Sequence, residues 1–216
     1  MAPDPLPRLA VRDAAPARAV VLLLHGGREH GHEPTTARQP APLRMVPFAL
    51  ALRRAGRGRG LAVATLGYRH RGWNGEEASP VPDARWALER LRAAHPGAPI
   101  VLAGHSMGAR TALRVADDPQ VCGVAALAPW VPRGEPVEQL AGRRVLLMHG
   151  TKDRTTPPAA TRAYAVRASQ VTEVELVEVP GEGHALLRRA GLWHRAVTGF
   201  VLGCLDGRDA PVPAAD

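Results

Sequence analysis

The residues of this chain that are best placed for chemistry are the five at positions 104–108, which read GHSMG. They follow the apolar run at 100–103 and precede a segment at 109–116 that is rich in helix formers and has apolar residues every three to four positions. Glycines on both sides of a serine let a strand and a helix pass close together, so that the serine is presented in a sharp turn as a nucleophile. We therefore expect Ser106 to be a catalytic nucleophile, and the alternative is that it only caps the helix.

A second feature that suits acyl transfer is the HGG sequence at 25–27, directly after the continuous apolar run at 19–24. A glycine pair just past a buried strand lets a backbone N–H point to the end of that strand, where a developing oxyanion needs donors. The backbone N–H groups of Gly27 and Met107 would supply them. Taken alone, the glycine pair is explained equally well as a tight turn.

A serine hydroxyl needs a base before it can attack at neutral pH. His184 follows the alternating segment 171–179 and a glycine-rich turn, and Asp153 follows the apolar run 145–148. His184 would accept the proton of Ser106, while Asp153 would fix the tautomer of the imidazole and stabilise the imidazolium. These groups suffice for acyl transfer, so we expect no metal and no organic cofactor.

Two tryptophans in loops could line a substrate pocket beside these groups. Trp130 follows the expected strand at 121–128, and Trp73 lies in the loop after the apolar run at 61–66. Each ring offers a large apolar surface to an acyl or alcohol group. We name both as candidate substrate-binding residues, although Trp73 would pack equally well on the neighbouring helix.

The remaining histidines have simpler explanations. We expect His105 to be a packing residue, because the turn directs the neighbours of the serine away from the site, and His25 to hydrogen-bond within its own loop. His30, His32 and Glu33 could in principle ligate a metal, but no supporting ligand pattern accompanies them.

Strand-like apolar runs alternate with helical segments along the chain, which predicts an α/β fold. The intervals allow right-handed crossovers, so we expect a mostly parallel sheet of about seven strands with helices on both faces. In such sheets the chemistry lies at the carboxyl ends of the strands, where all the residues named above fall. The expected strands are at 8–12, 19–24, 61–66, 100–103, 121–128, 145–148 and 171–179, and the expected helices at 43–55, 82–95, 109–116, 158–168 and from the turn at 180–184 to about 205.

The connection at 131–144 is too short to hold a folded lid. It has only fourteen residues between two expected strands. We therefore expect no cap domain and an open site, and leave undecided whether the polar loop at 28–40 covers it.

The composition is that of an ordinary globular chain, with 45% apolar and 22% charged residues. Its 216 residues fit a single domain over 1–216, with disordered tails at 1–7 and 207–216. The 27 scattered arginines and one lysine outnumber the 20 acidic residues and give a net charge of +8, without the aromatic interleaving of a nucleic-acid module. No apolar stretch reaches membrane length, and the first residues do not form a secretory signal. We expect a cytoplasmic protein that binds neither nucleic acid nor membranes.

Over about residues 20–205 the chain resembles the α/β-hydrolase superfamily. The order Ser106, Asp153, His184 is the order of nucleophile, acid and histidine in that superfamily. The resemblance implies the α/β-hydrolase fold and carries the three catalytic roles onto these residues. The motif at 104–108 matches the nucleophile elbow, and the segments at 149–153 and 181–184 look like the loops that bear the acid and the histidine.

The short, lidless form and the APW segment at 128–130 are similar to the dienelactone-hydrolase and cutinase-like esterase branches. Ser106 stands where dienelactone hydrolases have a cysteine, so their substrate is not carried over. The resemblance implies hydrolysis of a small carboxylic ester or thioester through an acyl-enzyme. A peptidase or an acyltransferase could use the same residues, and a binding protein that has kept the fold without the chemistry is a further alternative.

Overall fold

A seven-stranded sheet, in the order β1-β3-β2-β4-β5-β6-β7, forms the centre of the computed structural model, which describes residues 5–12 and 17–206. The edge strand β1 runs antiparallel to β3, and every other pair of neighbours is parallel. The strands are β1 (Arg8–Arg12), β2 (Ala19–Leu24), β3 (Leu61–Gly67), β4 (Ile100–His105), β5 (Val121–Leu127), β6 (Arg144–Gly150) and β7 (Val174–Val179).

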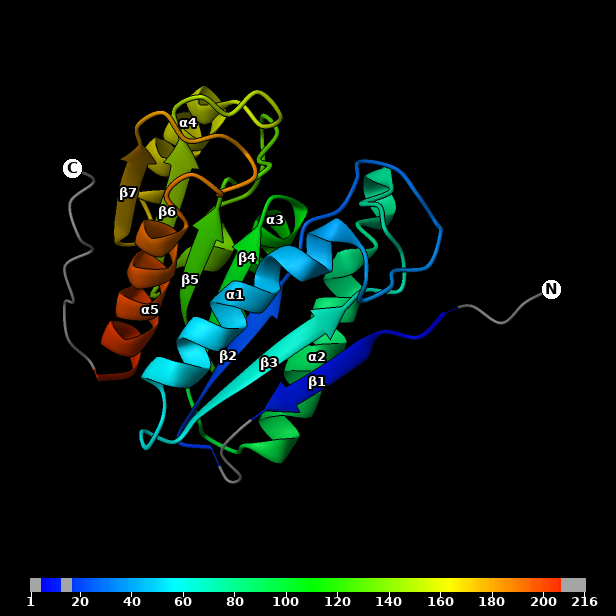
Figure 1. Cartoon of the computed structure of the whole chain (residues 1–216), viewed down its shortest axis with the longest axis vertical. Helices are drawn as coiled ribbons and strands as arrows, with labels where there is room; N and C mark the ends of the chain where they lie inside the picture. The colour runs from blue at the N-terminus through cyan, green and yellow to red at the C-terminus, as the bar shows by residue number, and fades with distance from the viewer. Residues whose placement is uncertain (1–4, 13–16, 207–216) are drawn as a thin grey trace.

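Helices cover both faces of the sheet (Figure 1). One face carries α1 and α5, and the other carries α2, α3 and α4. Residues 128–143, between β5 and β6, hold only one 3₁₀ turn, η2 (Glu138–Leu140), so no cap domain stands there. The helices are α1 (Pro40–Ala55), α2 (Pro80–Ala94), α3 (Met107–Arg114), α4 (Pro158–Ala168) and α5 (Ala190–Asp206), with a further 3₁₀ turn η1 (Gly75–Glu77).

The central strands are buried on both faces, which explains why they read as continuous apolar runs in the sequence. Every residue of β2 and β4 is buried. Alternate side chains of each strand enter two separate clusters: Leu22 and Leu24 pack with α2 and α3, whereas Val21 and Leu23 pack with α1 and α5. The expected fold class, a mostly parallel α/β-hydrolase sheet without a cap, is confirmed.

Two element boundaries differ from the sequence expectation for identifiable reasons. The helix expected from 43 begins at Pro40, because proline fits the first turn of a helix, where its missing N–H has no partner to lose. The strand expected from 171 begins at Val174. The N–H groups of Val171 and Thr172 both bond to the carbonyl of Ala168, so these residues close the end of α4 and cannot join the sheet.

The expected disordered tails fall mainly on residues 1–4 and 207–216, which lie outside the described residues. Residues 5–7 have no regular secondary structure. A single domain over 1–216 stays a prediction. Within the described ranges, no helix is long and apolar enough to cross a membrane.

Candidate active site

Ser106 occupies a strained turn between β4 and α3. Its backbone has φ 57° and ψ −118°, a conformation that residues with a Cβ rarely adopt. The glycines on either side are required by close backbone contacts. A Cβ on Gly104 would lie 2.3 Å from the carbonyl oxygen of Gly108, and a Cβ on Gly108 would lie 2.2 Å from that of Leu24. The GHSMG sequence therefore forms the turn that its spacing predicts, with the serine at the amino end of α3.

Ser106, His184 and Asp153 form a continuous chain of hydrogen bonds. The hydroxyl oxygen of Ser106 lies 3.0 Å from His184 Nε2, and His184 Nδ1 lies 2.8 Å from Asp153 Oδ2. A carboxylate can only accept, so Nδ1 carries the imidazole proton and Nε2 has a lone pair for the proton of the serine. The side chain of Asp153 is fully buried, whereas that of His184 is 20% exposed. The structure thus brings the three residues together in the geometry that proton transfer requires.

The carboxylate of Asp153 accepts hydrogen bonds from several groups besides His184. His149 Nε2 lies 3.1 Å from Asp153 Oδ2, the hydroxyl of Thr156 donates to the same oxygen at 2.9 Å, and the N–H groups of Thr155 and Thr156 donate to Oδ1. Burial opposes the charge of this carboxylate, but hydrogen bonds from His149, His184 and the backbone outweigh it and hold the pKa of Asp153 well below its usual range. Asp153 is therefore ionised at any pH at which His184 can act as a base.

His149 and Thr156 are site residues that the sequence reasoning missed. His149 Nδ1 lies 2.7 Å from the hydroxyl of Thr161, which donates to it, so Nε2 keeps its proton for Asp153. Thr156 Oγ1 also lies 3.1 Å from His184 Nδ1. The signal that could have revealed them is the run of polar residues at 149–156, directly after the apolar run at 145–148.

His105 makes two contacts with His184, a hydrogen bond and a ring contact. Its Nε2 donates to the backbone carbonyl of His184 at 2.9 Å, and the two rings are 4.8 Å apart at their centroids. Burial, the main cause, lowers the pKa of His105 to about 3, so its imidazole is neutral. The sequence reasoning expected a packing residue, but this side chain also anchors the loop that carries His184.

Gly27 and Met107 lie next to each other beside Ser106. A Cβ on Gly27 would be 2.4 Å from Met107 Cε and 2.5 Å from the carbonyl oxygen of Arg71, so only glycine fits there. Met107 is the first residue of α3, where backbone N–H groups have no partner within the helix. Neither the Gly27 N–H nor the Met107 N–H makes a hydrogen bond to another described residue. Both donors are therefore unused within the described part of the chain.

The two tryptophans named from the sequence pack edge to face, with their ring centroids 6.0 Å apart, and both contact one arginine. The guanidinium of Arg110 is 3.7 Å from the ring centroid of Trp73 and 4.6 Å from that of Trp130. Arg110 Nε donates to the buried Glu135 at 2.7 Å. Trp73 is only 3% exposed and belongs to the core, whereas Trp130 is half-buried and its backbone N–H donates to the carbonyl of Ser106 at 3.3 Å. Of the two rings, Trp130 is therefore the one with surface to offer a substrate.

Comparison with known families decides the assignment of the fold. Residues 15–144 match the family model described as serine aminopeptidase, S33, which covers more than half of the chain and includes Ser106. The chain belongs to this family of α/β serine hydrolases. The matched segment ends before Asp153 and His184, so the remainder of the hydrogen-bonded chain rests on the geometry described above. No curated protein sequence matches the chain.

Solved structures with the same fold cover almost all of this α/β hydrolase. A lidless α/β serine hydrolase from Xanthomonas campestris is 21% identical over 93% of this chain and 87% of its own, with a TM-score of 0.58. A monoacylglycerol lipase from Paleococcus ferrophilus is 18% identical over 92% and 99%, with a TM-score of 0.69. Esterase 2 of Thermogutta terrifontis is 19% identical over 95% and 91%, also at 0.69. At these identities the similarity shows the fold alone.

The loop at 28–40 of this hydrolase pairs with the loop after β3 through two isolated β-bridges. One joins Arg28 to Gly72, and the other joins Pro34 to His70. His32 Nε2 lies 3.0 Å from Glu77 Oε2, so the histidines of this loop do not converge. Among the described residues there is no group of three or more His, Cys, Asp or Glu side chains that could hold a metal ion.

Proposed function

We propose that this chain hydrolyses carboxylic esters or thioesters through an acyl-enzyme on Ser106. The observation that carries the proposal is the unbroken chain from Ser106 Oγ through His184 to Asp153, with contacts of 3.0 and 2.8 Å. A protein that had kept only the fold would not need to hold these three groups in line, nor to surround Asp153 with four donors.

The reaction follows from the positions of the donors and acceptors. Ser106 Oγ attacks the carbonyl carbon of the ester while its proton passes to His184 Nε2, and the N–H groups of Gly27 and Met107 bind the oxyanion that develops. When the intermediate collapses, the bond to the alcohol oxygen breaks and His184 returns the proton to that oxygen. Water then attacks the acyl-enzyme while its proton passes to His184. When this second intermediate collapses, His184 returns the proton to Ser106 Oγ and the acid is released. Asp153, held ionised by its hydrogen bonds, stabilises the imidazolium in each step.

An ester is favoured over an aminopeptidase substrate by the charges beside Ser106. An aminopeptidase has to bind a substrate ammonium group, which needs an available carboxylate. The buried carboxylates near the site are already bonded: Glu135 to Arg110, and Glu182 to the N–H groups of Gly183 and Arg189. The names of the similar monoacylglycerol lipase and of esterase 2 also support an ester.

The test is steady-state kinetics with p-nitrophenyl esters of increasing chain length, alongside aminoacyl p-nitroanilides. Asp153→Asn should lower kcat by roughly 10³–10⁴-fold, because an amide at this position favours the wrong imidazole tautomer. Asp117→Asn, at an exposed carboxylate paired with Arg85, is the matched control and should leave kcat unchanged. Faster turnover of the anilides than of the esters would overturn the ester assignment. Retention of more than about a tenth of kcat/KM in Asp153→Asn would show that the acid lies elsewhere.

A further inference from the structure

The hydrogen-bonded chain that begins at Ser106 does not end at Asp153 but continues through His149 into α4. His149 Nε2 lies 3.1 Å from Asp153 Oδ2, and His149 Nδ1 lies 2.7 Å from the hydroxyl of Thr161. His149 is the last residue but one of β6, and Thr161 lies in α4. The two residues are 1% and 0% exposed. Neither side chain can reach a substrate, so any effect of His149 on the reaction has to pass through Asp153.

The imidazole proton of His149 lies on Nε2, toward the carboxylate. Nε2 faces two acceptors, Asp153 Oδ2 and the carbonyl oxygen of Thr156 at 3.0 Å. A ring nitrogen with a lone pair would repel both oxygens, so Nε2 is the donor. Nδ1 faces the hydroxyl of Thr161, which can donate to it. His149 thus presents an N–H to Asp153 without needing a positive charge.

His149 and His184 donate to the same oxygen of the carboxylate. His184 Nδ1 lies 2.8 Å from Asp153 Oδ2, which also accepts the hydroxyl of Thr156 at 2.9 Å. Burial alone would raise the pKa of Asp153, and the hydrogen bond from His149 is the first among the contacts that hold it well below its usual range. Each donor at Oδ2 takes up part of the negative charge that would otherwise stabilise a protonated His184. His149 therefore acts against protonation of His184.

The same hydrogen bond also fixes the orientation of the carboxylate. The N–H groups of Thr155 and Thr156 donate to Asp153 Oδ1 at 2.8 and 3.0 Å, while His149 donates to Oδ2 from β6. A carboxylate bonded at both oxygens cannot rotate without losing these bonds, so Oδ2 stays directed at His184 Nδ1. The position of the carboxylate and its charge both depend on His149.

Within the described residues, the other charged or titratable groups around His184 form no hydrogen bond to the carboxylate of Asp153. His105 donates to the backbone carbonyl of His184 instead, at 2.9 Å. Burial, the main cause, lowers the pKa of His105 to about 3, so this ring is neutral. The remaining groups are Arg44 of α1, which donates to the carbonyl of Ala185, Glu182, which accepts two backbone N–H groups, and the exposed Lys152 and Arg154. It is thus His149, and not His105, that bonds to the carboxylate.

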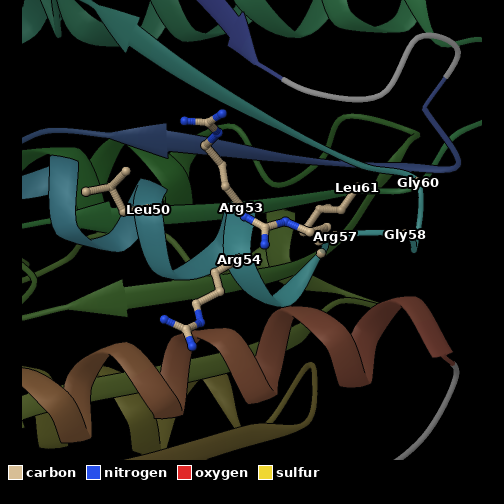
Figure 2. Close-up of a pocket in the computed structure, with 8 residues that line it drawn as sticks. Leu50, Arg53, Arg54, Arg57, Gly58, Gly60 and Leu61 are labelled. Atoms are coloured by element: carbon tan, nitrogen blue, oxygen red, sulfur yellow. The ribbon is translucent and has the colours of Figure 1, made fainter.

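A cluster of exposed arginines lies at the opposite edge of the sheet from His184. Figure 2 shows it around a cavity of about 580 Å³ at the end of α1, lined by Arg53, Arg54 and Arg57. Leu61, which begins β3, lines the same cavity, so it lies at the amino ends of the parallel strands. His184 follows the carboxyl end of β7, and a strand of six or seven residues spans about 20 Å. Because the Debye length is about 8–10 Å, the field of these arginines is largely screened at His184.

We infer that His149 is a positioning residue that extends the working range of His184 to lower pH. Its N–H holds Asp153 Oδ2 toward His184 and draws charge from that oxygen, so that His184 stays unprotonated in more acidic solution and can still accept the proton of Ser106. No proton passes to or from His149 in this role. The inference rests on the proposed function, because it concerns the base of that reaction.

The kinetic test is the pH dependence of kcat/KM for p-nitrophenyl acetate in the native chain and in His149→Phe, which keeps a ring but removes the donor. The pH at which kcat/KM falls to half of its plateau should move upward by about 0.5–1 unit, which lowers kcat/KM on the acidic side by about three- to tenfold. KM should change by less than about twofold, because His149 does not touch the substrate. A loss of activity that is equal at all pH values would mean that His149 only supports the fold, and would overturn the inference.

Further variants separate the donor from the packing of the ring. His149→Gln carries an amide N–H to the place of Nε2 and should bring the half-point back to within about 0.2 unit of the native value. Thr156→Val removes the hydroxyl that donates to the same oxygen and should move the half-point in the same direction as His149→Phe, so it decides the matter if His149→Phe does not fold. An unmoved half-point in Thr156→Val would then overturn the inference.

The matched control is His95→Phe. His95 is also buried, but it lies between α2 and β4, where its Nδ1 accepts the backbone N–H of Ala17 at 3.2 Å. This substitution should leave the half-point unchanged. Thermal unfolding shows which variants are folded.

An NMR titration of the imidazole signals tests His184 without any substrate. The signals of His184 are assigned from their absence in His184→Gln, and their midpoint should move upward in His149→Phe by about 0.5–1 unit. An unmoved midpoint in the folded variant would overturn the inference, whatever the enzyme hydrolyses. A raised midpoint in a chain that hydrolyses no ester would support the effect of His149 on His184 and overturn the ester proposal alone.

Discussion

Ser106 stores backbone strain at the point where the reaction is proposed to occur. A residue with a Cβ at φ 57° costs on the order of 1–3 kcal/mol, and the surrounding contacts must impose it. The close approach of Gly104 and Gly108 to neighbouring backbone shows how the turn is fixed. The contacts that impose this conformation keep the Ser106 hydroxyl at the end of β4, within reach of His184, before any substrate binds.

Residue types and spacing were enough to name Ser106, His184 and Asp153, because each directly follows a strand and the order of the three is distinctive. Their catalytic roles stay a prediction. The polar run at 149–156 marks the segment that holds the partners of Asp153, but it does not say that His149 and Thr156 bond to the carboxylate, since that depends on how the segment folds. Arg110 gave no signal at all, because an arginine in an amphipathic helix is ordinarily solvated, and only the structure shows its contacts with two tryptophans.

A prediction at this scale concerns the buried His105. Its folded-state pKa of about 3 lies below the ordinary value of 6.5, so the unfolded chain takes up a proton first as the pH falls. The free energy of unfolding should therefore decrease between about pH 6.5 and pH 3, with His105 contributing up to about 1.4 kcal/mol per pH unit, and this contribution should be absent above pH 7.

His105→Gln removes the titrating group but keeps a donor for the carbonyl of His184. Urea unfolding at several pH values should show a shallower slope for this variant than for the native chain, and His30→Gln, at an exposed histidine, is the control. The slope will not vanish, because His25 is buried with a pKa of about 4. An unchanged slope in His105→Gln would mean that His105 is not held neutral.

At the scale of elements, continuous apolar runs identified the central strands β2 to β6, because strands buried on both faces contain little charge, and alternation identified the edge strands β1 and β7. The expected boundaries were less accurate where the same alternation of residues fits the end of one element and the start of the next. Val171 and Thr172 continue the alternation of β7, yet they close the last turn of α4. Sequence periodicity cannot decide which element takes such residues, since the outcome depends on a backbone hydrogen bond to Ala168.

A prediction about stability concerns the close packing at the junction of β4 and α3. Gly108→Ala should destabilise the chain by about 2–3 kcal/mol and abolish activity, because its Cβ would overlap the backbone of Leu24 and His25. Helix propensity alone would favour alanine, so the sign of the effect isolates the clash. Gly199→Ala in α5, where a Cβ meets nothing within 4 Å, should instead stabilise by about 0.5–1 kcal/mol. Equal effects of the two substitutions on the denaturation midpoint would contradict the close packing at the turn.

At the scale of the whole molecule, the order of the strands assembles the site. Gly27, Ser106, Trp130, Asp153 and His184 follow β2, β4, β5, β6 and β7, which are consecutive in the sheet at a spacing of about 4.8 Å. Segments separated by more than 150 positions in sequence therefore lie together at the carboxyl ends of these strands, and Figure 1 shows the strands that carry them side by side. The parallel sheet could be predicted from the alternation of elements, but its strand order could not, because the pattern of one strand does not say which neighbour it pairs with.

The absence of a cap between β5 and β6 predicts the kinetics. Rates with soluble short-chain esters should saturate with concentration, and no jump should occur when a substrate passes its solubility limit, since nothing has to open at an interface. Initial rates measured across that limit test this expectation. A sharp rise would mean that the loop at 28–40 opens as a lid despite its bridges to Gly72 and His70.

The most direct test is to identify the residue that forms the acyl-enzyme. A fluorophosphonate should add one equivalent to the native chain, and peptide mass spectrometry should place it on Ser106 rather than on Ser79 or Ser169, the other two serines of the chain. Ser106→Ala should abolish the adduct, and His184→Gln should slow its formation by orders of magnitude, because the base is lost. An adduct that persists unchanged in Ser106→Ala, or that maps to another residue, would contradict the proposed mechanism.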